Sequence, residues 1–238
     1  MFERPHHLKL AKVLEALDGQ VLRDNNCLFG GGTAIALRYG EYRESVDIDF
    51  LVSDVAAYGR LRQALMGAKG LSAVTRAGLV LKQTRELRAD QYGLRTMLEV
   101  EQQQIKFEIV LEGRIALAPP TAADLVCGIA TLTAMDLATS KLLANSDRWA
   151  DDGVFSRDVI DLAMMAPKLD LLRRAIAKAE SAYGDSVLRD LGKAIEQLKN
   201  RQGRLDRCMQ AMGMRMPRAV LWQKIRALER VLPKGVPG

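Results

Sequence analysis

A strand pattern that carries two acids constrains the fold of this chain more than any other feature. Residues 46–52 read VDIDFLV, which is apolar and β-branched except for Asp47 and Asp49, and such a run predicts a strand. Because alternate side chains of a strand share one face, we expect both aspartates to project together while Ile48 and Phe50 point into the core. Two carboxylates about 6–7 Å apart on one face are costly to leave unpaired. A bound Mg²⁺ or Mn²⁺ removes that cost, so the strand predicts a metal site.

A run of glycines lies upstream of this strand. Residues 29–40, FGGGTAIALRYG, predict a short strand that enters a glycine turn, followed by a short helix with Thr33 near its N-cap. Gly31 and Gly32 let the backbone approach a phosphate closely, and the first amides of the helix can donate hydrogen bonds to it. Each motif alone is common in turns or at solvated strand ends. In this order they predict a triphosphate clamp beside a metal site, as attack on an α-phosphate requires.

A third carboxylate, which a site for two metal ions needs, is available from the segment QIKFEIV at residues 104–110. If Ile105, Phe107 and Ile109 face the core, the alternation of a strand turns Glu108 to the opposite face. A neighbouring strand could then bring Glu108 beside the two aspartates. The sequence alone does not fix the register of the two strands.

The chain changes character at a double proline, which neither a sheet nor a helix interior accommodates. Before it, helical and strand patterns alternate, and residues 71–115 are typical of a β-meander. After it every pattern is helical, including DLVCGIATL at residues 124–132. We therefore predict an α/β (α+β) domain over residues 1–118 and an all-helical domain over residues 119–238.

The net charge of +6 is concentrated in the C-terminal third of the 238 residues. Residues 1–158 hold 19 Lys and Arg against 21 Asp and Glu, and residues 159–238 hold 16 against 8, so the two parts carry −2 and +8. A basic region of this kind is typical of a surface that binds nucleic acid, and also of an ordinary solvated helical surface.

The compartment can also be predicted. The N-terminus lacks the apolar core of a signal peptide, and no apolar run approaches the ~18 residues of a membrane span. The three cysteines are scattered and odd in number, which indicates reduced thiols instead of a disulfide framework. We expect a cytoplasmic protein with no membrane partner.

Two motif blocks, about a hundred residues apart, stand out. The first is GGTAIAL followed by YRESVDIDFLV, and the second is TSKLLANSDR followed by SRDVIDLAMM. Together they resemble the nucleotidyltransferases of the DNA-polymerase-β type, and more narrowly the AbiEii/AbiGii toxin family of type IV toxin–antitoxin and phage-defence systems. The resemblance covers roughly residues 25–165. It implies a nucleotidyltransferase-fold mixed sheet with flanking helices, and a helical domain that contributes Lys141 and Asp158 to the active site.

The resemblance implies roles for five residues of the first block in nucleotide binding. Gly31, Gly32 and Thr33 would line the triphosphate. Arg43 and Ser45 would lie at the rim of the site, near the nucleotide.

The same resemblance implies the metal ligands and the catalytic residues. Asp47 and Asp49 would bind the metal, and Glu108 matches the third carboxylate, a position that is more familiar as Asp. Lys141 would contact the β- or γ-phosphate, and Asp158 would organise the site or activate the acceptor hydroxyl.

The residues of the second block also have ordinary structural interpretations. Lys141 lies among leucines, where a lysine commonly extends its stem along apolar surface and keeps its charge in water. Asp158 and Asp161 are three residues apart on one helical face, and Arg148 or Arg157 could simply pair with them.

The resemblance finally implies an activity. The protein would transfer a nucleoside monophosphate from an NTP to an acceptor hydroxyl, release pyrophosphate and require Mg²⁺ or Mn²⁺. It would act as a growth-inhibiting toxin held in check by an antitoxin encoded nearby. RNA is the expected acceptor because the C-terminal region is basic, and the resemblance implies the 3′ end of tRNA as the leading candidate, since several relatives modify tRNA. The alternatives are a protein hydroxyl as acceptor, or a non-catalytic module that binds nucleic acid or a partner on an inactive nucleotidyltransferase scaffold.

Overall fold

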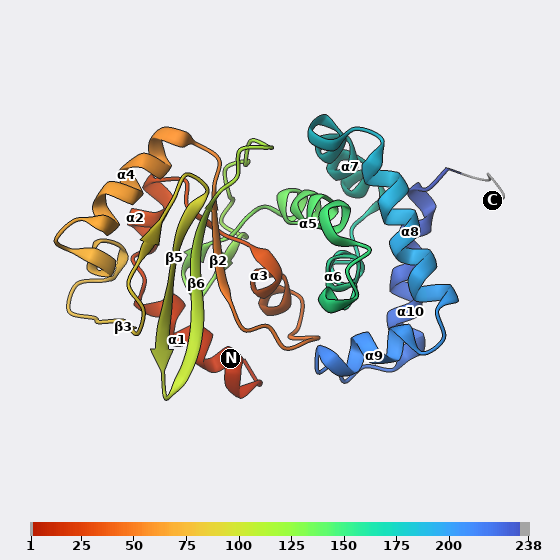
Figure 1. Ribbon diagram of the computed structural model, residues 1–238, viewed down its shortest axis with the longest axis horizontal. Coiled ribbons are helices and arrows are strands. Elements are labelled where there is room, and N and C mark those ends of the chain that lie inside the picture. Colours follow the sequence, from red (N-terminus) through yellow and green to blue (C-terminus); the bar gives the residue numbers. More distant parts are fainter. Residues whose placement is uncertain (1, 234–238) are drawn as a thin grey trace. The chain divides into compact units, whose positions relative to one another are not determined.

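The computed structural model describes residues 2–233, and the chain folds into two compact units (Figure 1). The first, called here the sheet unit, comprises Met1–Glu41 and Ser45–Ala134. The second, called here the helical unit, comprises Tyr42–Glu44 and Met135–Gly238. Each unit is described by itself below.

The boundary between the units lies later in the chain than residue 118, where the sequence analysis placed it. The sheet unit continues to Ala134 because the segment after the double proline pairs with its first strand. Thr131 forms a parallel bridge with Phe29, and the backbone N–H of Leu132 donates to the carbonyl of Phe29 at 2.9 Å. The composition change at the prolines therefore marks a loop within the first unit.

Within the described residues the sheet unit contains a six-stranded mixed sheet, in the order β1-β2-β6-β5-β3, with β4 also paired to β5. Among the named strands of this sheet within residues 2–233, β2 and β6 run parallel and the other pairs are antiparallel. The predicted mixed sheet is therefore confirmed. The strands are β1 Leu28–Phe29, β2 Ile48–Val52, β3 Lys82–Gln83, β4 Arg88–Ala89, β5 Gly93–Val100 and β6 Gln103–Leu111.

The core of the sheet unit lies on one face of β2 and β6. Ile48, Phe50, Phe107 and Ile109 are all fully buried, which confirms the predicted alternation along both strands. The ring of Phe50 lies between those of Phe29 and Phe107, with centroids 5.6 and 5.7 Å away in tilted arrangements. Tilted packing at these distances is favourable for aromatic rings. Burial of this face turns Asp49 and Glu108 to the opposite one.

Helices flank both faces of this sheet. They are α1 Pro5–Ala16, α2 Gly19–Asp24, α3 Gly31–Arg38 and α4 Val55–Met66, followed by the 3₁₀ turn η1 Gly70–Val74. Figure 1 shows α3 and α4 on opposite sides of the sheet, and both contact β2. Asp54 caps α4 by accepting a hydrogen bond from the N–H of Ala57 at 2.6 Å. The N-cap of α3 is Gly30, so Thr33 lies inside the first turn of that helix.

The helix expected at residues 124–132 was wrong. The structure has a hairpin there, made of β7 Leu125–Val126 and β8 Ile129–Ala130. Its two turn residues, Cys127 and Gly128, have φ of 50° and 77°. Two consecutive left-handed residues make the turn that matches the twist of a two-residue hairpin. The Cys-Gly pair was the sequence signal, and the apolar run around it obscured that signal.

The helical unit contains only helices and helical turns within its described part, as predicted. They are α5 Ala134–Arg148, η2 Asp152–Val154, α6 Arg157–Met164, α7 Leu169–Tyr183, α8 Ser186–Asn200, α9 Arg204–Ala211, α10 Arg218–Arg226 and η3 Ala227–Val231. Each long helix buries one stripe; in α8 the stripe includes Val187, Leu191 and Leu198. Among residues 2–233, no helix combines the length and the apolar character that crossing a membrane requires.

Candidate active site

The parallel pairing of β2 with β6 sets the geometry of the acid-bearing face. Asp49 lies directly opposite Glu108 in the register of the two strands. Adjacent strands lie about 4.8 Å apart, so the two side chains are neighbours on one face. Asp47 immediately precedes β2, and Asp47 and Asp49 are both partly exposed. The tertiary structure thus places Glu108 beside an aspartate, which the sequence could only propose.

Glu108 is neutralised by basic side chains of the same unit. It is buried, and its two carboxylate oxygens pair with the guanidinium of Arg95 and the ammonium of Lys106. Residues 2–233 contain no group of three or more His, Cys, Asp or Glu side chains placed to hold a metal ion. The roles of Glu108, Asp47 and Asp49 as metal ligands therefore stay predictions.

The charges of Glu108, Asp49 and Asp47 all act on the ammonium of Lys106. Burial opposes its charge, but the hydrogen bond and charge of Glu108, helped by Asp49 and Asp47, raise the pKa of its ammonium above the ordinary value. An ammonium that close offsets part of the repulsion within the acid group. The face is therefore a mixed site, acidic at β2 and basic beyond β6.

The glycine turn lies directly against Asp49. Gly31 has φ of +66°, and a Cβ atom added to it would lie 2.5 Å from Oδ2 of Asp49. The backbone N–H of Gly30 donates to the carbonyl of Asp49 at 2.8 Å. Only glycine permits both the left-handed backbone and this approach. The acid pair thus emerges next to the first turn of α3, whose leading amides have no partner inside the helix and can donate to an anion.

The hydroxyl groups predicted at the nucleotide are engaged inside the protein. Thr33 Oγ1 donates to the carbonyl of Asp47 at 2.5 Å and lies 2.8 Å from Ser45 Oγ. Both residues are buried. Their side chains hold the segment that delivers Asp47 to the face, so the donors left for a phosphate in this turn are the backbone amides.

His7, which sequence reasoning missed, supports the same segment. Its Nδ1 lies 2.7 Å from Oε1 of Glu41, and its Nε2 accepts the backbone N–H of Ser45 at 3.2 Å. Because Nε2 is the acceptor, the proton sits on Nδ1 and the ring is neutral. Burial lowers the pKa of His7, against the opposing influence of Glu41. No local pattern connects residues 38 positions apart, so only the fold could find this contact.

A second group of charged residues lies in the helical unit and centres on Asp161 of α6. Its carboxylate accepts hydrogen bonds from Arg43 at 2.6 and 2.9 Å and from the hydroxyl of Tyr42 at 2.6 Å. The ammonium of Lys141 lies 2.8 Å away. Asp161 is fully buried, and it was absent from the predicted site. Its spacing of three residues from Asp158 was the only sequence signal.

Asp158 is bound in the same way. Lys141 contacts its Oδ1 at 2.9 Å, and Arg148 donates to both of its oxygens at 2.7 and 2.9 Å. The structural interpretation that Arg148 pairs with Asp158 is therefore correct, and Arg157 is exposed. Lys141 is buried between two carboxylates, so it is not a lysine that reaches along the surface to water.

The electrostatics of this group favour full ionisation. Burial alone would raise the pKa of Asp158, but Lys141 and Arg148 outweigh it and hold that pKa well below its usual range. Arg43 and Lys141 do the same for the pKa of Asp161. The three cations and two carboxylates of this group thus compensate one another within the helical unit.

The backbone that leads into α6 is strained. Phe155 and Ser156 have φ of 53° and 52°, a region that side chains other than glycine rarely adopt. Each such residue costs about 1–3 kcal/mol and persists only where its surroundings hold it. One restraint is visible, because Arg204 donates to Ser156 Oγ at 3.3 Å.

The predicted site residues thus fall into two sets. Gly31, Gly32, Thr33, Ser45, Asp47, Asp49 and Glu108 belong to the sheet unit, and Arg43, Lys141 and Asp158 belong to the helical unit. Arg43 and Ser45 were expected at the rim of the site, near the nucleotide; both are buried and bonded within the protein. Their contact with a nucleotide stays a prediction.

The chain is similar to known proteins in sequence and in fold. Residues 12–230 match the family model described as nucleotidyl transferase AbiEii toxin, type IV TA system. Two crystal structures have a similar fold, one of a proposed nucleotidyltransferase from H. pylori and one of JHP933 from Helicobacter pylori. Each is 18% identical with a TM-score of 0.52; 97% of this chain is covered, and 95% and 93% of the respective H. pylori chains. No curated protein sequence matches the chain.

Proposed function

Because the chain belongs to the AbiEii family of nucleotidyl transferase toxins of type IV toxin–antitoxin systems, we propose that it transfers a nucleoside monophosphate from an NTP to a hydroxyl of RNA. The family that the motifs resembled is thereby confirmed, and with it a nucleotidyltransferase. The acceptor, the metal and the roles of single residues are our proposals. The family also implies a cognate antitoxin, which would control the activity in the cell.

The observation that carries the proposal is the contact between Asp49 and Gly31. A carboxylate pressed against the start of α3, with Asp47 beside it, puts metal ligands next to amides that can hold phosphate. Mg²⁺ is usually held by one or two carboxylates and completes its shell with substrate phosphates, so Asp47 and Asp49 fit it as a pair. When bound, Mg²⁺ or Mn²⁺ would neutralise the charge that builds up on the reacting phosphate.

The remaining roles fall to the chain's own groups. The amides of Gly31 and Gly32 orient the triphosphate and fix the leaving pyrophosphate. Lys141 would offer its ammonium to the β- or γ-phosphate, the role that the resemblance of its motif block implies. Asp158 holds Lys141 in place at 2.9 Å. The basic residues after position 158, with a net charge of +8 from 16 Lys and Arg against 8 Asp and Glu, favour RNA as the acceptor, and the 3′ end of tRNA is our first candidate.

Transfer of radiolabel tests the proposal. The protein is incubated with each NTP labelled on the α-phosphate, with Mg²⁺ and with total RNA or a cell lysate. We expect label on a small RNA, and none when the label is on the γ-phosphate, because pyrophosphate leaves. Label on a protein band would mean that the acceptor is a protein hydroxyl instead of RNA. The absence of label under every condition would contradict the proposed nucleotidyltransferase activity.

A pair of variants ties the activity to the acid face. Asp47→Ala should lower transfer by about 10³-fold or more, since it removes a carboxylate that would hold the metal ion next to the reacting phosphate, and should relieve growth inhibition on expression. Asp170→Ala is the matched control, because its side chain is 81% exposed and pairs only along its own helix. If Asp47→Ala stayed as toxic as the parent, transfer would not explain toxicity.

A further inference from the structure

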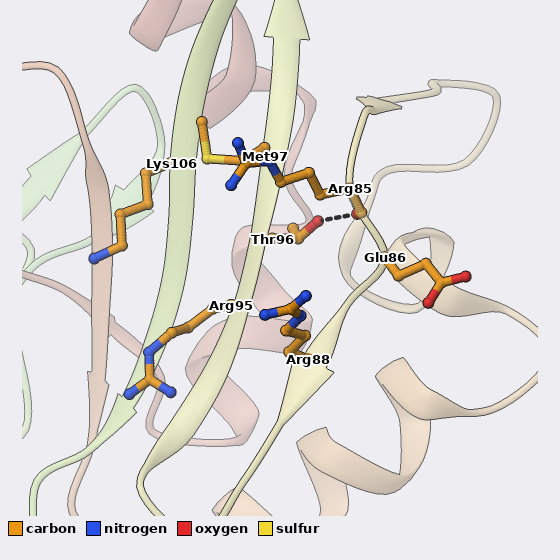
Figure 2. A pocket seen from close by; sticks show the side chains of 7 residues that line it. All are labelled: Arg85, Glu86, Arg88, Arg95, Thr96, Met97 and Lys106. Atoms are coloured by element: carbon orange, nitrogen blue, oxygen red, sulfur yellow. Dashed lines mark hydrogen bonds between the residues drawn. The ribbon is translucent and has the colours of Figure 1, made fainter.

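A basic pocket lies on the sheet unit, on the same face as the acids. It is a cavity of about 560 Å³ bordered by β5, β6 and the segment from β3 to β4. Four cations line it, namely Arg85, Arg88, Arg95 and Lys106. Figure 2 shows Arg95 and Lys106 on the long strands and Arg85 and Arg88 on the facing segment.

Two of these cations have no acidic partner within residues 2–233. Arg95 pairs with Asp90 and Glu108, and Lys106 pairs with Glu108. Arg85 and Arg88 are exposed, and within residues 2–233 neither side chain forms an ion pair. The one acid that lines the cavity, Glu86, directs its carboxylate away from the four cations in Figure 2. Two guanidinium groups are therefore available to an external anion.

The strand register connects this pocket with the acid face. Asp49 pairs with Glu108, Glu108 with Arg95, and Arg95 with Arg88, so one row crosses four strands. At about 4.8 Å per strand, the row spans roughly 14 Å from Asp49 to Arg88. Gly31 and the start of α3 lie at the Asp49 end. The glycine turn, the acids and the arginines thus lie along one line across the sheet.

The chemistry of nucleotidyl transfer gives this line a direction. The acceptor oxygen forms a bond to the α-phosphorus as the α–β anhydride bond breaks, and the two oxygens lie on opposite sides of that phosphorus. Pyrophosphate leaves with the electron pair, and the hydroxyl proton passes to solvent or to a base. With the triphosphate tail at the α3 end, the acceptor must approach from β6 and β5, where the basic pocket lies.

We propose that the pocket binds the phosphodiester backbone of the RNA acceptor, next to the hydroxyl that reacts. Planar guanidinium groups hold phosphate through paired hydrogen bonds, which suits Arg85 and Arg88. The backbone of Arg85 is held in place, because Thr96 Oγ1 donates to its carbonyl at 2.6 Å, the dashed line in Figure 2. This inference rests on the proposed function and names the part of the substrate that the pocket recognises.

The test is the double variant Arg85→Ala/Arg88→Ala in the full chain. With total tRNA as the RNA, we expect the KM for RNA to rise about tenfold and the KM for NTP to stay unchanged. The slope of log KM against log salt should fall by about 2, one for each lost phosphate contact. Arg62→Ala/Lys69→Ala removes the same charge from exposed residues outside the pocket and should behave like the parent.

A conservative variant separates charge from structure. Arg85→Lys/Arg88→Lys keeps both charges, so it should restore the salt slope and part of the RNA affinity but not the part due to paired hydrogen bonds, whereas a purely structural role would not be rescued. The proposed role of the pocket would be wrong if the KM for RNA were unchanged in the alanine variant, or if it rose equally in the Arg62/Lys69 control. RNA labelling by the parent protein would still stand in either case. If the parent labels no RNA, the proposed function fails first, and the two failures are thereby distinguished.

Discussion

Asp47 belongs to the sheet unit and Asp161 to the helical unit, and the surroundings of these two acids are opposite. Asp47 is partly exposed, and within residues 2–233 its carboxylate forms no hydrogen bond or ion pair. Asp161 is fully buried and bound by Arg43, Lys141 and Tyr42. The comparison shows which acid has capacity for an external cation and which one already has its cations from the chain.

This difference distinguishes an acid that can bind a metal ion from an acid that stabilises the fold. An acid with spare capacity gains most when a metal ion arrives, because its repulsion with a neighbouring acid is removed. A saturated acid gains nothing from the metal, but its loss would leave buried cations without a partner. Asp47 should therefore matter for activity, and Asp161 for stability.

The largest expected effect is on stability. Asp161→Ala should destabilise the helical unit by about 3–5 kcal/mol, since it leaves buried charges uncompensated, whereas Asp47→Ala should change stability by about 0.5 kcal/mol or less. Both tryptophans, Trp149 and Trp222, belong to the helical unit, so their fluorescence during urea unfolding reports that unit. Equal unfolding midpoints for the two variants would break the comparison.

The second prediction concerns the position of Asp49. Gly31→Ala and Gly40→Ala both force a residue with a Cβ into left-handed backbone, with φ of +66° and +86°, at about 1–2 kcal/mol each. Only at Gly31 would the new Cβ meet Asp49, because nothing lies within 4 Å of it at Gly40. We expect transfer to fall about 10²-fold for Gly31→Ala and to persist for Gly40→Ala. Equal activities would mean that the contact with Asp49 does not position it.

The third prediction is a pH dependence in the sheet unit. Burial lowers the pKa of His7 below its ordinary 6.5; Glu41 raises it, and Arg4 and His6 lower it further. The unfolded chain then binds the proton more readily, so stability is complete above pH 6.5 and falls as the pH drops through that value towards the folded pKa. The slope is at most about 1.4 kcal/mol per pH unit. Hydrogen exchange of the sheet unit between pH 7.5 and 5.5 measures it, and His7→Gln should reduce the slope.

The smallest expected effect lies in the β7–β8 turn. Cys127 has φ of 50° and is followed by Gly128, and asparagine before glycine is the preferred pair in such a turn. Cys127→Asn should stabilise the sheet unit by up to about 1 kcal/mol, while activity stays the same. Thermal unfolding followed by circular dichroism decides this, and a lowered midpoint would show that the thiol contributes packing that outweighs the strain.

The acid face could be predicted because its signals are local. The period of two along residues 46–52 places both aspartates on one face without any knowledge of the partner strand. The same is true of Asp54, which caps α4 three residues before its hydrogen-bond donor. The prediction for residues 124–132 failed for the opposite reason. An apolar run there fits either a helix or a strand until the turn of the hairpin is recognised.

By itself, the sequence determined the family, the acid-bearing strand and the glycine turn before it, since each depends on a few neighbouring residues and on the alternation of the backbone. Only the tertiary structure decided that Asp49 lies against Gly31 and opposite Glu108, that Arg43 binds Asp161 from 118 residues away, and that Arg88 continues the row beyond Arg95. Strand register and long-range ion pairs come from how the packed elements fit together, and no local pattern encodes that fit.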